Sequence, residues 1–282
     1  MFTRPGGPSR ERATADGFAP AEPSELTECR AVAVLVPDLA VEEVDERLVQ
    51  PHAFPGAVLV FAHGFALRRP NPFSVRDDLD LVLVGPLGPG ALLRERYEAG
   101  QGLAGLFAVV RDVSGRAEPL GLAWAAAIGL TRAGVLQTSL EEEVVSDLFA
   151  EQVVLVGGVV ELMRNAWEVL TEGGVSEEIA YYSCVQELKQ IMDLVHAAGP
   201  AGMRAMISGT AQYGGLTRGP RIVGEAAREE MQRALEEIQD GGFAKEWLAE
   251  RGEGSGRLRD LLAKETEHPM ERVGDRVRRE LG

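Results

Sequence analysis

Two carboxylates in the middle of the sequence are spaced to act together on a metal ion. Asp147 and Glu151 lie in the stretch EEEVVSDLFAEQ (141–152), within a proline-free apolar periodicity that predicts a helix. Residues four apart share one helix face, and paired carboxylate oxygens suit a hard cation such as Mg²⁺. The pair also fits a solvated acidic face, the ordinary role of such spacing. Leu148 and residues 153–156 indicate a buried helix, and because buried carboxylates need a partner, they favour the metal site.

The elements that must position these acids begin with four short apolar runs that predict buried strands. The runs are at 31–36, 57–62, 79–84 and 103–110, with helices predicted at 39–50 and 119–130. Nearly continuous apolar strands alternating with helices are typical of an α/β layer with a parallel sheet. Functional loops of such sheets lie at the carboxyl ends of the strands, where His63 and the loop GPLGPG (85–90) fall. No strand is followed by the GxGxxG turn that holds a dinucleotide.

From residue 140 onward the pattern is helical almost throughout. Helices are predicted at 141–171, 176–198, 200–213, 224–240, 243–251 and 256–280, and Gly157-Gly158 is expected to kink or split the first. The first 28 residues are rich in Pro, Gly, Ser, Arg and Glu and lack periodicity. The predicted organisation is a disordered leader (1–28), an α/β domain (29–138) and a helical domain (139–282).

Composition and charge exclude several classes of partner. The 282 residues carry a formal net charge of −15, which argues against nucleic acid and against an anionic membrane surface. Cys29 and Cys184 form no CxxC motif, so we expect no zinc knuckle and no disulfide framework, which fits a cytoplasmic protein. No apolar run reaches 18 residues, so we expect no membrane span.

Nine segments, in order over about residues 30–282, together resemble ketol-acid reductoisomerase, an enzyme family of branched-chain amino acid synthesis. They are LVPD (35–38), PGAVLVFAHGF (55–65), GPLGPG (85–90), LTRAGV (130–135), SDLFAEQ (146–152), YYSCVQELK (181–189), ISGTAQYG (207–214), TRGPRI (217–222) and EHPMERVG (267–274). The resemblance implies an α/β remnant of a Rossmann-like domain, followed by an all-helical, knotted domain. It is to the short form of the family, which implies a homodimer whose chains share their active sites.

The family's chemistry is a Mg²⁺-dependent alkyl migration in a 2-hydroxy-2-alkyl-3-oxo acid, followed by hydride transfer from NADPH. The resemblance places the first pair of metal ligands on Asp147 and Glu151. Of the second pair, which the partner chain contributes, Glu187 is retained and Ser183 replaces its companion.

Two further positions carry the chemistry that the resemblance implies. The family's histidine in the AHGF segment falls on His63, which is then the candidate for proton transfer. The serine that contacts the substrate carboxylate falls on Ser208.

Three departures from the family pattern change these implications. Leu87 replaces a lysine of the GPLGPG loop, and leucine neither donates hydrogen bonds nor stabilises negative charge. Ser183 removes a charge beside the second metal, so we expect one well-held Mg²⁺ and a second that binds weakly or not at all. The family's first strand and glycine-rich turn have no counterpart here, so we expect NADPH not to be used.

These observations lead to three hypotheses. The first is a Mg²⁺-dependent isomerase, rearrangement or lyase enzyme that acts on a small 2-hydroxy or 2-oxo acid without NADPH, in a specialised pathway. The second is a non-catalytic dimerisation or regulatory partner of a complete reductoisomerase. The third is a residual acetohydroxy-acid isomeroreductase of branched-chain amino acid synthesis.

Each retained residue also has a purely structural interpretation. Glu187 could pair with Lys189 or an arginine, Ser208 could bond to its own helix backbone, and His63 could be a satisfied loop histidine. Their survival as a set with the two acids favours retained metal binding, because buried acids are costly without a partner. Two further histidines are interpreted as structural: His196 and His268.

Overall fold

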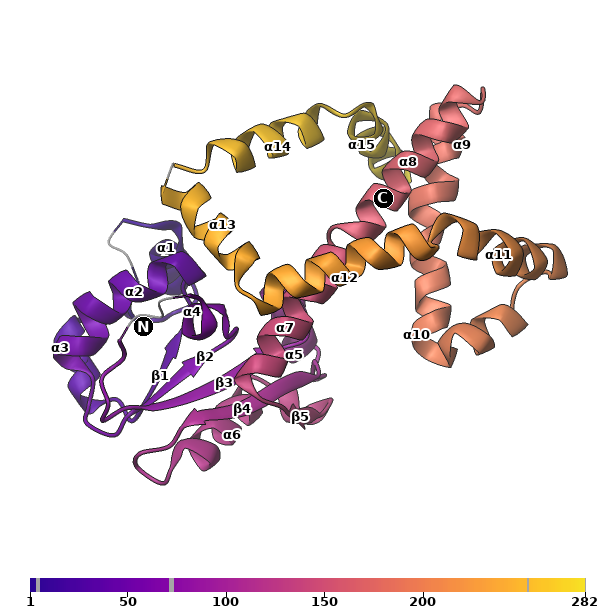
Figure 1. The fold of residues 1–282 in the computed structure, drawn as a ribbon. Coiled ribbons are helices and arrows are strands. Elements are labelled where there is room, and N and C mark those ends of the chain that lie inside the picture. The colour runs from indigo at the N-terminus through magenta and orange to yellow at the C-terminus, as the bar shows by residue number, and fades with distance from the viewer. Residues whose placement is uncertain (4–5, 71–73, 253, 282) are drawn as a thin grey trace. The chain divides into compact units, whose positions relative to one another are not determined.

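A five-stranded sheet forms the centre of the first half of the chain in the computed structural model, which describes residues 1–3, 6–70, 74–252 and 254–281 (Figure 1). The strands, whose spatial order follows the chain, are β1 (Ala31–Val34), β2 (Val58–Phe61), β3 (Asp80–Pro86), β4 (Gly105–Arg111) and β5 (Val135–Gln137). The first three are parallel to one another, β4 runs antiparallel to β3, and β5 is parallel to β4.

The direction of β4 corrects the sequence prediction of a parallel sheet. The helix between β3 and β4, α5 (Gly90–Glu98), has no fully buried residue, although its Leu93 packs, partly buried, against the core beneath α6 (Ala117–Ala127). The chain returns beside β3 and pairs with it from Leu81–Arg111 to Pro86–Gly105. The apolar run at 103–110 indicated a strand correctly, but apolarity carries no information about strand direction.

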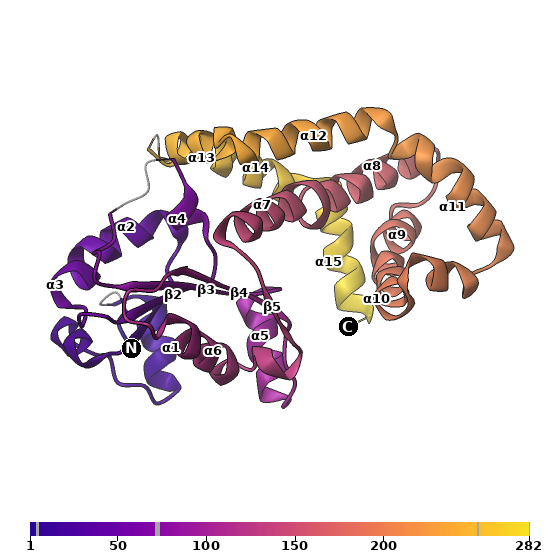
Figure 2. The ribbon, with the colours of Figure 1, turned by 60° about the horizontal axis from the view of Figure 1, so that its bottom comes forward.

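Side chains of the strands alternate between two cores, one on each face of the sheet. Leu59 and Phe61 enter the core that faces the segment between β1 and β2, whereas Val58 and Val60 enter the core beneath α6. Figure 2 shows α2 and α4 on one side of the sheet and α6 on the other. This is the layered, Rossmann-like arrangement that the sequence predicted. The helical elements are η2 (Asp38–Ala40), α2 (Val41–Val44), the π-helical turn η3 (Asp45–Val49), α3 (Gln50–His52), α4 (Phe65–Arg68), α6 (Ala117–Ala127) and η4 (Leu130–Arg132).

The N-terminal segment differs from the disordered leader expected over residues 1–28, of which residues 4–5 lie outside the described part. It contains α1 (Pro8–Ala15) and the 3₁₀ helix η1 (Pro23–Glu28). Leu26 is 1% exposed, and η1 contacts α3 and η3. The Glu22 backbone N–H donates to Glu25 Oε1 at 2.6 Å, which satisfies one donor at the start of η1. A single apolar residue in a polar stretch gives no periodicity, so its burial is decided by tertiary packing.

The chain divides into two compact units, Met1–Ser146 and Asp147–Gly282. The division falls inside the helix α7 (Leu140–Ala150), eight residues after the boundary predicted at 138–139. The second unit is helical in its regular elements, as predicted. They are the π-helical turn η5 (Glu151–Leu155), α8 (Gly158–Glu172), α9 (Glu177–Tyr181), the π-helical turn η6 (Tyr182–Gln186), α10 (Glu187–Ala205), α11 (Gly209–Ile222), α12 (Glu225–Gln239), α13 (Gly242–Gly252), α14 (Gly256–Glu267) and α15 (Pro269–Leu281).

The helix predicted at 141–171 is broken where the two consecutive glycines lie. A Cβ on Gly157 would come 2.0 Å from the Gln152 backbone oxygen, and one on Gly158 would come 1.9 Å from that of Val153. Only glycine permits this tight exit from η5 into α8. The knot stays a prediction. None of the helices in the described ranges has the length and apolarity needed to cross a membrane.

Candidate active site

A buried glutamate on the first turns of α7 organises the carboxyl end of β2. Glu143 is 3% exposed. Its Oε1 lies 2.8 Å from Nδ1 of His63, which follows β2, and its Oε2 accepts a hydrogen bond from the Gly64 backbone N–H at 3.0 Å. The loop after β3 is also close, since a Cβ on Gly85 would lie 3.6 Å from Glu143 Oε1. As predicted, His63 and the loop 85–90 lie at carboxyl ends of parallel strands.

The close approach of α7 to this edge leaves no room for a Cβ at position 64 unless the side chains around it shift. A Cβ there would come 2.4 Å from Leu140 Cδ1 and 2.7 Å from Val144 Cγ2, distances that side chains do not adopt. Val144 is buried and lies on the apolar face of α7, next to Glu143 in the sequence. The helix is further fastened by Arg68 of α4, whose Nη2 donates to Glu141 Oε1 at 2.7 Å. The hydrogen bond from Arg68 lowers the pKa of Glu141.

The contacts of Glu143 set the tautomer of His63. An ionised carboxylate only accepts hydrogen bonds, so Nδ1 of His63 carries the hydrogen and donates it. Nε2 is then the basic nitrogen of the neutral ring. A buried carboxylate beside the ring also stabilises the imidazolium that forms when Nε2 takes a proton. The pair can therefore hold His63 in the orientation and tautomer that a general base requires.

Asp147 lies one turn further along α7 than Glu143, so the uninterrupted helix places both acids on one face. His63, Glu143 and Asp147 each offer a ligand atom, and these atoms lie within 4.8 Å of one another. Both oxygens of Glu143 are already engaged by His63 and Gly64. Glu143 is therefore the residue that orients His63, and Asp147 keeps its predicted role as a metal-ligand candidate.

The environment of the predicted acid pair differs from the buried helix inferred from sequence. Asp147 is half-buried, whereas Glu151 is exposed and begins the π-helical turn η5. The apolar run after it is exposed in the single chain, with Leu155 61% and Val156 65% exposed. The prediction of a buried helix was wrong for this segment. An apolar run indicates that its side chains pack against another surface, but not that this surface belongs to the same chain.

The other predicted site residues lie on the second unit. Glu187 is exposed and follows the π-helical turn η6, which contains Ser183. π-Helical turns are rare and often occur at functional sites; η5 begins with Glu151, and η6 ends directly before Glu187. Lys189, considered as a partner of Glu187, pairs instead with Asp193 at 2.6 Å.

Ser208 is the N-cap of α11. The structural interpretation in which its side chain bonds to the backbone of a helix interior is therefore wrong. The Ser208 Oγ accepts from the Ala211 backbone N–H at 3.2 Å, so the hydroxyl hydrogen is directed elsewhere. Within the described part of the single chain, the metal-compatible group includes neither Glu151 nor Glu187.

Sequence reasoning missed Glu143 as a site residue. Its position four residues before Asp147 was the available signal, but three consecutive glutamates resemble a solvated face. Leu87, which replaces the family's lysine, is 47% exposed, and its backbone N–H donates to Ala104 O at 2.8 Å.

Comparisons with known proteins match this arrangement. The model of the acetohydroxy acid isomeroreductase NADPH-binding domain matches residues 1–134, and that of the ketol-acid reductoisomerase C-terminal domain matches residues 140–281. Ketol-acid reductoisomerases (NADP(+)) of Xylella fastidiosa and Xanthomonas axonopodis are each 42% identical over 276 residues. The aligned region covers 98% of this chain and 79% and 83% of those proteins.

Solved structures agree. An NADH-preferring ketol-acid reductoisomerase from an uncultured archaeon has a TM-score of 0.94 and 38% identity, covering 99% of this chain and 85% of that one. A semialdehyde dehydrogenase NAD-binding protein from Cupriavidus necator, at 17% identity and a TM-score of 0.62 over 84% of this chain and 86% of that one, shares the fold alone. On sequence and structure together, the chain belongs to the ketol-acid reductoisomerase family.

Proposed function

We propose that this chain catalyses the ketol-acid reductoisomerase reaction, in which a 2-hydroxy-2-alkyl-3-oxo acid undergoes a Mg²⁺-dependent alkyl shift and is reduced by NADPH. The observation that carries the proposal is the buried Glu143–His63 pair one helical turn from Asp147, in a chain 42% identical to NADP-dependent reductoisomerases. The match of residues 1–134 to an NADPH-binding domain conflicts with the expectation that NADPH is not used. The third hypothesis, an acetohydroxy-acid isomeroreductase, therefore takes precedence over the first, an enzyme that does not use NADPH.

The donor set fits Mg²⁺. Asp147 and Glu151 supply carboxylate oxygens, the ligand type that this ion prefers, and His63 is kept for proton transfer by its bond to Glu143. Bound Mg²⁺ would polarise the carbonyl and stabilise the alkoxide. We propose that one ion is held by Asp147 and Glu151, with Glu187 contributed by a second copy, and that Ser183 weakens a second ion.

The roles of the protein residues follow from their hydrogen bonds. His63 takes the proton of the substrate 2-hydroxyl at Nε2, while Glu143 retains the hydrogen bond to Nδ1–H and balances the ring's charge. The backbone N–H of Gly64 keeps the other oxygen of Glu143 in place. The Ser208 hydroxyl, whose oxygen already caps α11, can donate its hydrogen to the substrate carboxylate.

No described turn of the first unit carries the GxGxxG pattern that cradles a dinucleotide pyrophosphate. The residues present do not fit a dinucleotide held in that way. NADPH as the hydride donor rests on the domain match and on the names of the relatives.

Leu87 favours a second candidate, the Mg²⁺-dependent rearrangement without reduction. It presents an exposed apolar side chain where the family resemblance placed an ammonium group. A chain that lacks this charge retains the metal and His63 for isomerisation but loses a group that stabilises charge during reduction.

A homodimer with shared active sites is part of the proposal. Many large apolar side chains of the second unit are exposed in the single chain. They include Val154, Leu155, Val156, Leu162, Val169, Ile179, Met192, Met206, Tyr213, Leu216, Ile222 and Val223. A second copy would cover such a surface and bring its own Glu187.

One assay separates the candidates. The protein is mixed with 2-hydroxy-2-methyl-3-oxobutanoate, Mg²⁺ and NADPH, and both NADPH oxidation and the acid products are measured. Reductoisomerase activity consumes substrate and NADPH in equal amounts. Glu143→Gln should lower the rate of this consumption by about 10²-fold or more. Rearranged acid with no NADPH oxidation would establish the second candidate. A folded dimer that does neither would support the non-catalytic hypothesis.

A further inference from the structure

A cavity outside the candidate active site lies in the second unit, between α15 and the start of α9. Its volume is about 340 Å³, within the ordinary range of small-molecule pockets. Three of its lining residues are Arg272, Arg276 and Arg279, which share one face of α15 because they are spaced by four and three residues. We refer to the cavity with these arginines as the arginine groove. Glu177 and Asp275 also line the groove, so its lining carries three guanidinium groups and two carboxylates.

The hydrogen bonds around the groove show which charges are already engaged. Arg276 pairs with Glu178 at 2.7 Å and with Glu177 at 3.4 Å. Arg272 and Arg279 make no ion pair or side-chain hydrogen bond within the described ranges, and both are exposed. The groove therefore holds two guanidinium groups with unused donors on either side of a third that is fixed by its partners.

The helix that carries these arginines is firmly seated. Met270, Val273 and Val277 are buried in a core with Trp167 and Tyr181. The groove therefore stands on a rigid element, and the positions of its arginines along the helix are set before any ligand arrives.

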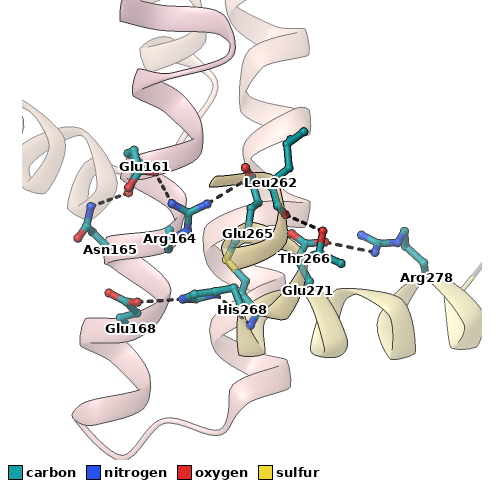
Figure 3. A network of polar contacts seen from close by, with 11 residues as sticks. Glu161, Arg164, Asn165, Glu168, Leu262, Glu265, Thr266, His268, Glu271 and Arg278 are labelled. Atoms are coloured by element: carbon teal, nitrogen blue, oxygen red, sulfur yellow. Dashed lines mark hydrogen bonds and ion pairs between the residues drawn. The ribbon is translucent and has the colours of Figure 1, made fainter. Parts of the chain in front are cut away.

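Polar contacts fix the start of the same helix (Figure 3). His268 Nδ1 accepts from the Met270 backbone N–H at 3.2 Å, so Nε2 carries the hydrogen that reaches Glu168 of α8 at 3.0 Å. Near the other end of α15, Arg278 Nη1 donates to the Tyr181 hydroxyl at 3.0 Å. The structural role expected for His268 is consistent with these contacts.

We propose that the arginine groove binds a small molecule that carries a phosphate group. Guanidinium groups donate paired, charge-assisted hydrogen bonds to phosphate oxygens. A carboxylate accepts such pairs too, but it carries about half the charge of a phosphate monoester and gains less from them. The cavity is larger than phosphate itself, so a phosphate monoester of a small metabolite suits it. Because the arginines are exposed, binding is salt-dependent.

The test is calorimetric titration of the full chain, at low ionic strength and without Mg²⁺, with inorganic phosphate and with glycerol 3-phosphate. Both should bind saturably, the monoester at least as tightly. The double substitution Arg272→Gln/Arg279→Gln should weaken binding by about tenfold or more. Arg259→Gln, which removes an exposed arginine of α14, is the matched control and should leave the affinity unchanged.

A second variant predicts the opposite sign. Glu177→Gln removes a carboxylate that lines the groove, while Glu178 still holds Arg276, so phosphate should bind about two- to fivefold more tightly. This variant keeps the proposal testable if the double variant is unstable in thermal unfolding followed by circular dichroism. No saturable binding, an equal loss in the Arg259 variant, exclusion of the monoester, or weaker binding after Glu177→Gln would each overturn the proposal.

Discussion

The two units of the chain bury their apolar residues to very different degrees. In the first unit, β2 and β3 are enclosed on both faces, with Val58, Leu59 and Val82 at most 1% exposed. In the second, a small core around Trp167 and Val273 coexists with Leu155 and Val156, which are more than 60% exposed. The difference shows that the first unit encloses its central strands, whereas the second leaves much of an apolar run exposed, which the second copy proposed above would cover. Four substitutions test this contrast.

The largest effect is expected at Asp80, at the start of β3. It is fully buried, and its carboxylate accepts from the backbone N–H groups of Val113 and Ser114 and from the Ser114 hydroxyl. Asp80→Ala leaves these donors unsatisfied and should lower the free energy of unfolding by about 3–5 kcal/mol, measured by urea denaturation. The control Asp78→Ala removes a half-exposed ion pair with Arg76 and should cost less than about 1 kcal/mol. Equal losses would contradict the self-contained first unit.

Leu155 and Leu136 form a matched pair, since each is 61% exposed and they lie in different units. Leu155→Glu should weaken self-association by about 2–3 kcal/mol, because a carboxylate would be buried where the second copy packs. Leu136→Glu should leave association unchanged. Sedimentation equilibrium measures both, and a dimer insensitive to Leu155→Glu would remove the second unit's surface from the interface.

Gly64 tests how tightly α7 is seated. Gly64→Ala forces a Cβ against Leu140 and Val144 and should cost about 1–3 kcal/mol of stability, with a larger proportional loss of activity because His63 is adjacent. Gly90→Ala is the control, since a Cβ there meets nothing within 4 Å. Thermal unfolding and the isomerisation assay report the two effects. An alanine variant with full activity would show that the spacing is not critical.

The smallest effect concerns a buried acid far from the site. Asp45 is 3% exposed, and its Oδ1 has no hydrogen-bond partner within the described residues. Burial raises its pKa, the hydrogen bond from Gln50 partly offsets this, and Glu46, Arg76 and Glu42 act more weakly. The folded pKa lies above the unfolded value, so folding favours the protonated form, and stability falls as pH rises between the two pKa values.

Asp45→Asn removes this ionisation. At pH values above the ordinary range of carboxyl pKa values, the variant should be about 1 kcal/mol more stable than the parent protein, and in acid it should show no such gain. Urea denaturation at several pH values checks the difference. A gain that is largest in acid would reverse the sign and contradict the argument.

The sequence by itself determined the elements and the family. Apolar runs located the strands from β1 to β4, and helical periodicity located most of the second half. The assignment of Asp147 and Glu151 as metal ligands, made from their spacing and from the family resemblance, stays a prediction. These features are local, because a pattern of period two or 3.6 is written into consecutive residues. The short strand β5 and the exposed helix α5 carried too weak a pattern to be predicted.

Only the tertiary structure decided which residues meet. The direction of β4, the ordered N-terminal segment and the exposure of Leu155 depend on partners distant in the sequence. Glu143 is the clearest case, since three consecutive glutamates look alike until α7 packs against Gly64 and turns one of them towards His63. The role of Glu143 depends on the groups around its carboxylate, and one of these groups, His63, lies 80 residues away in the sequence.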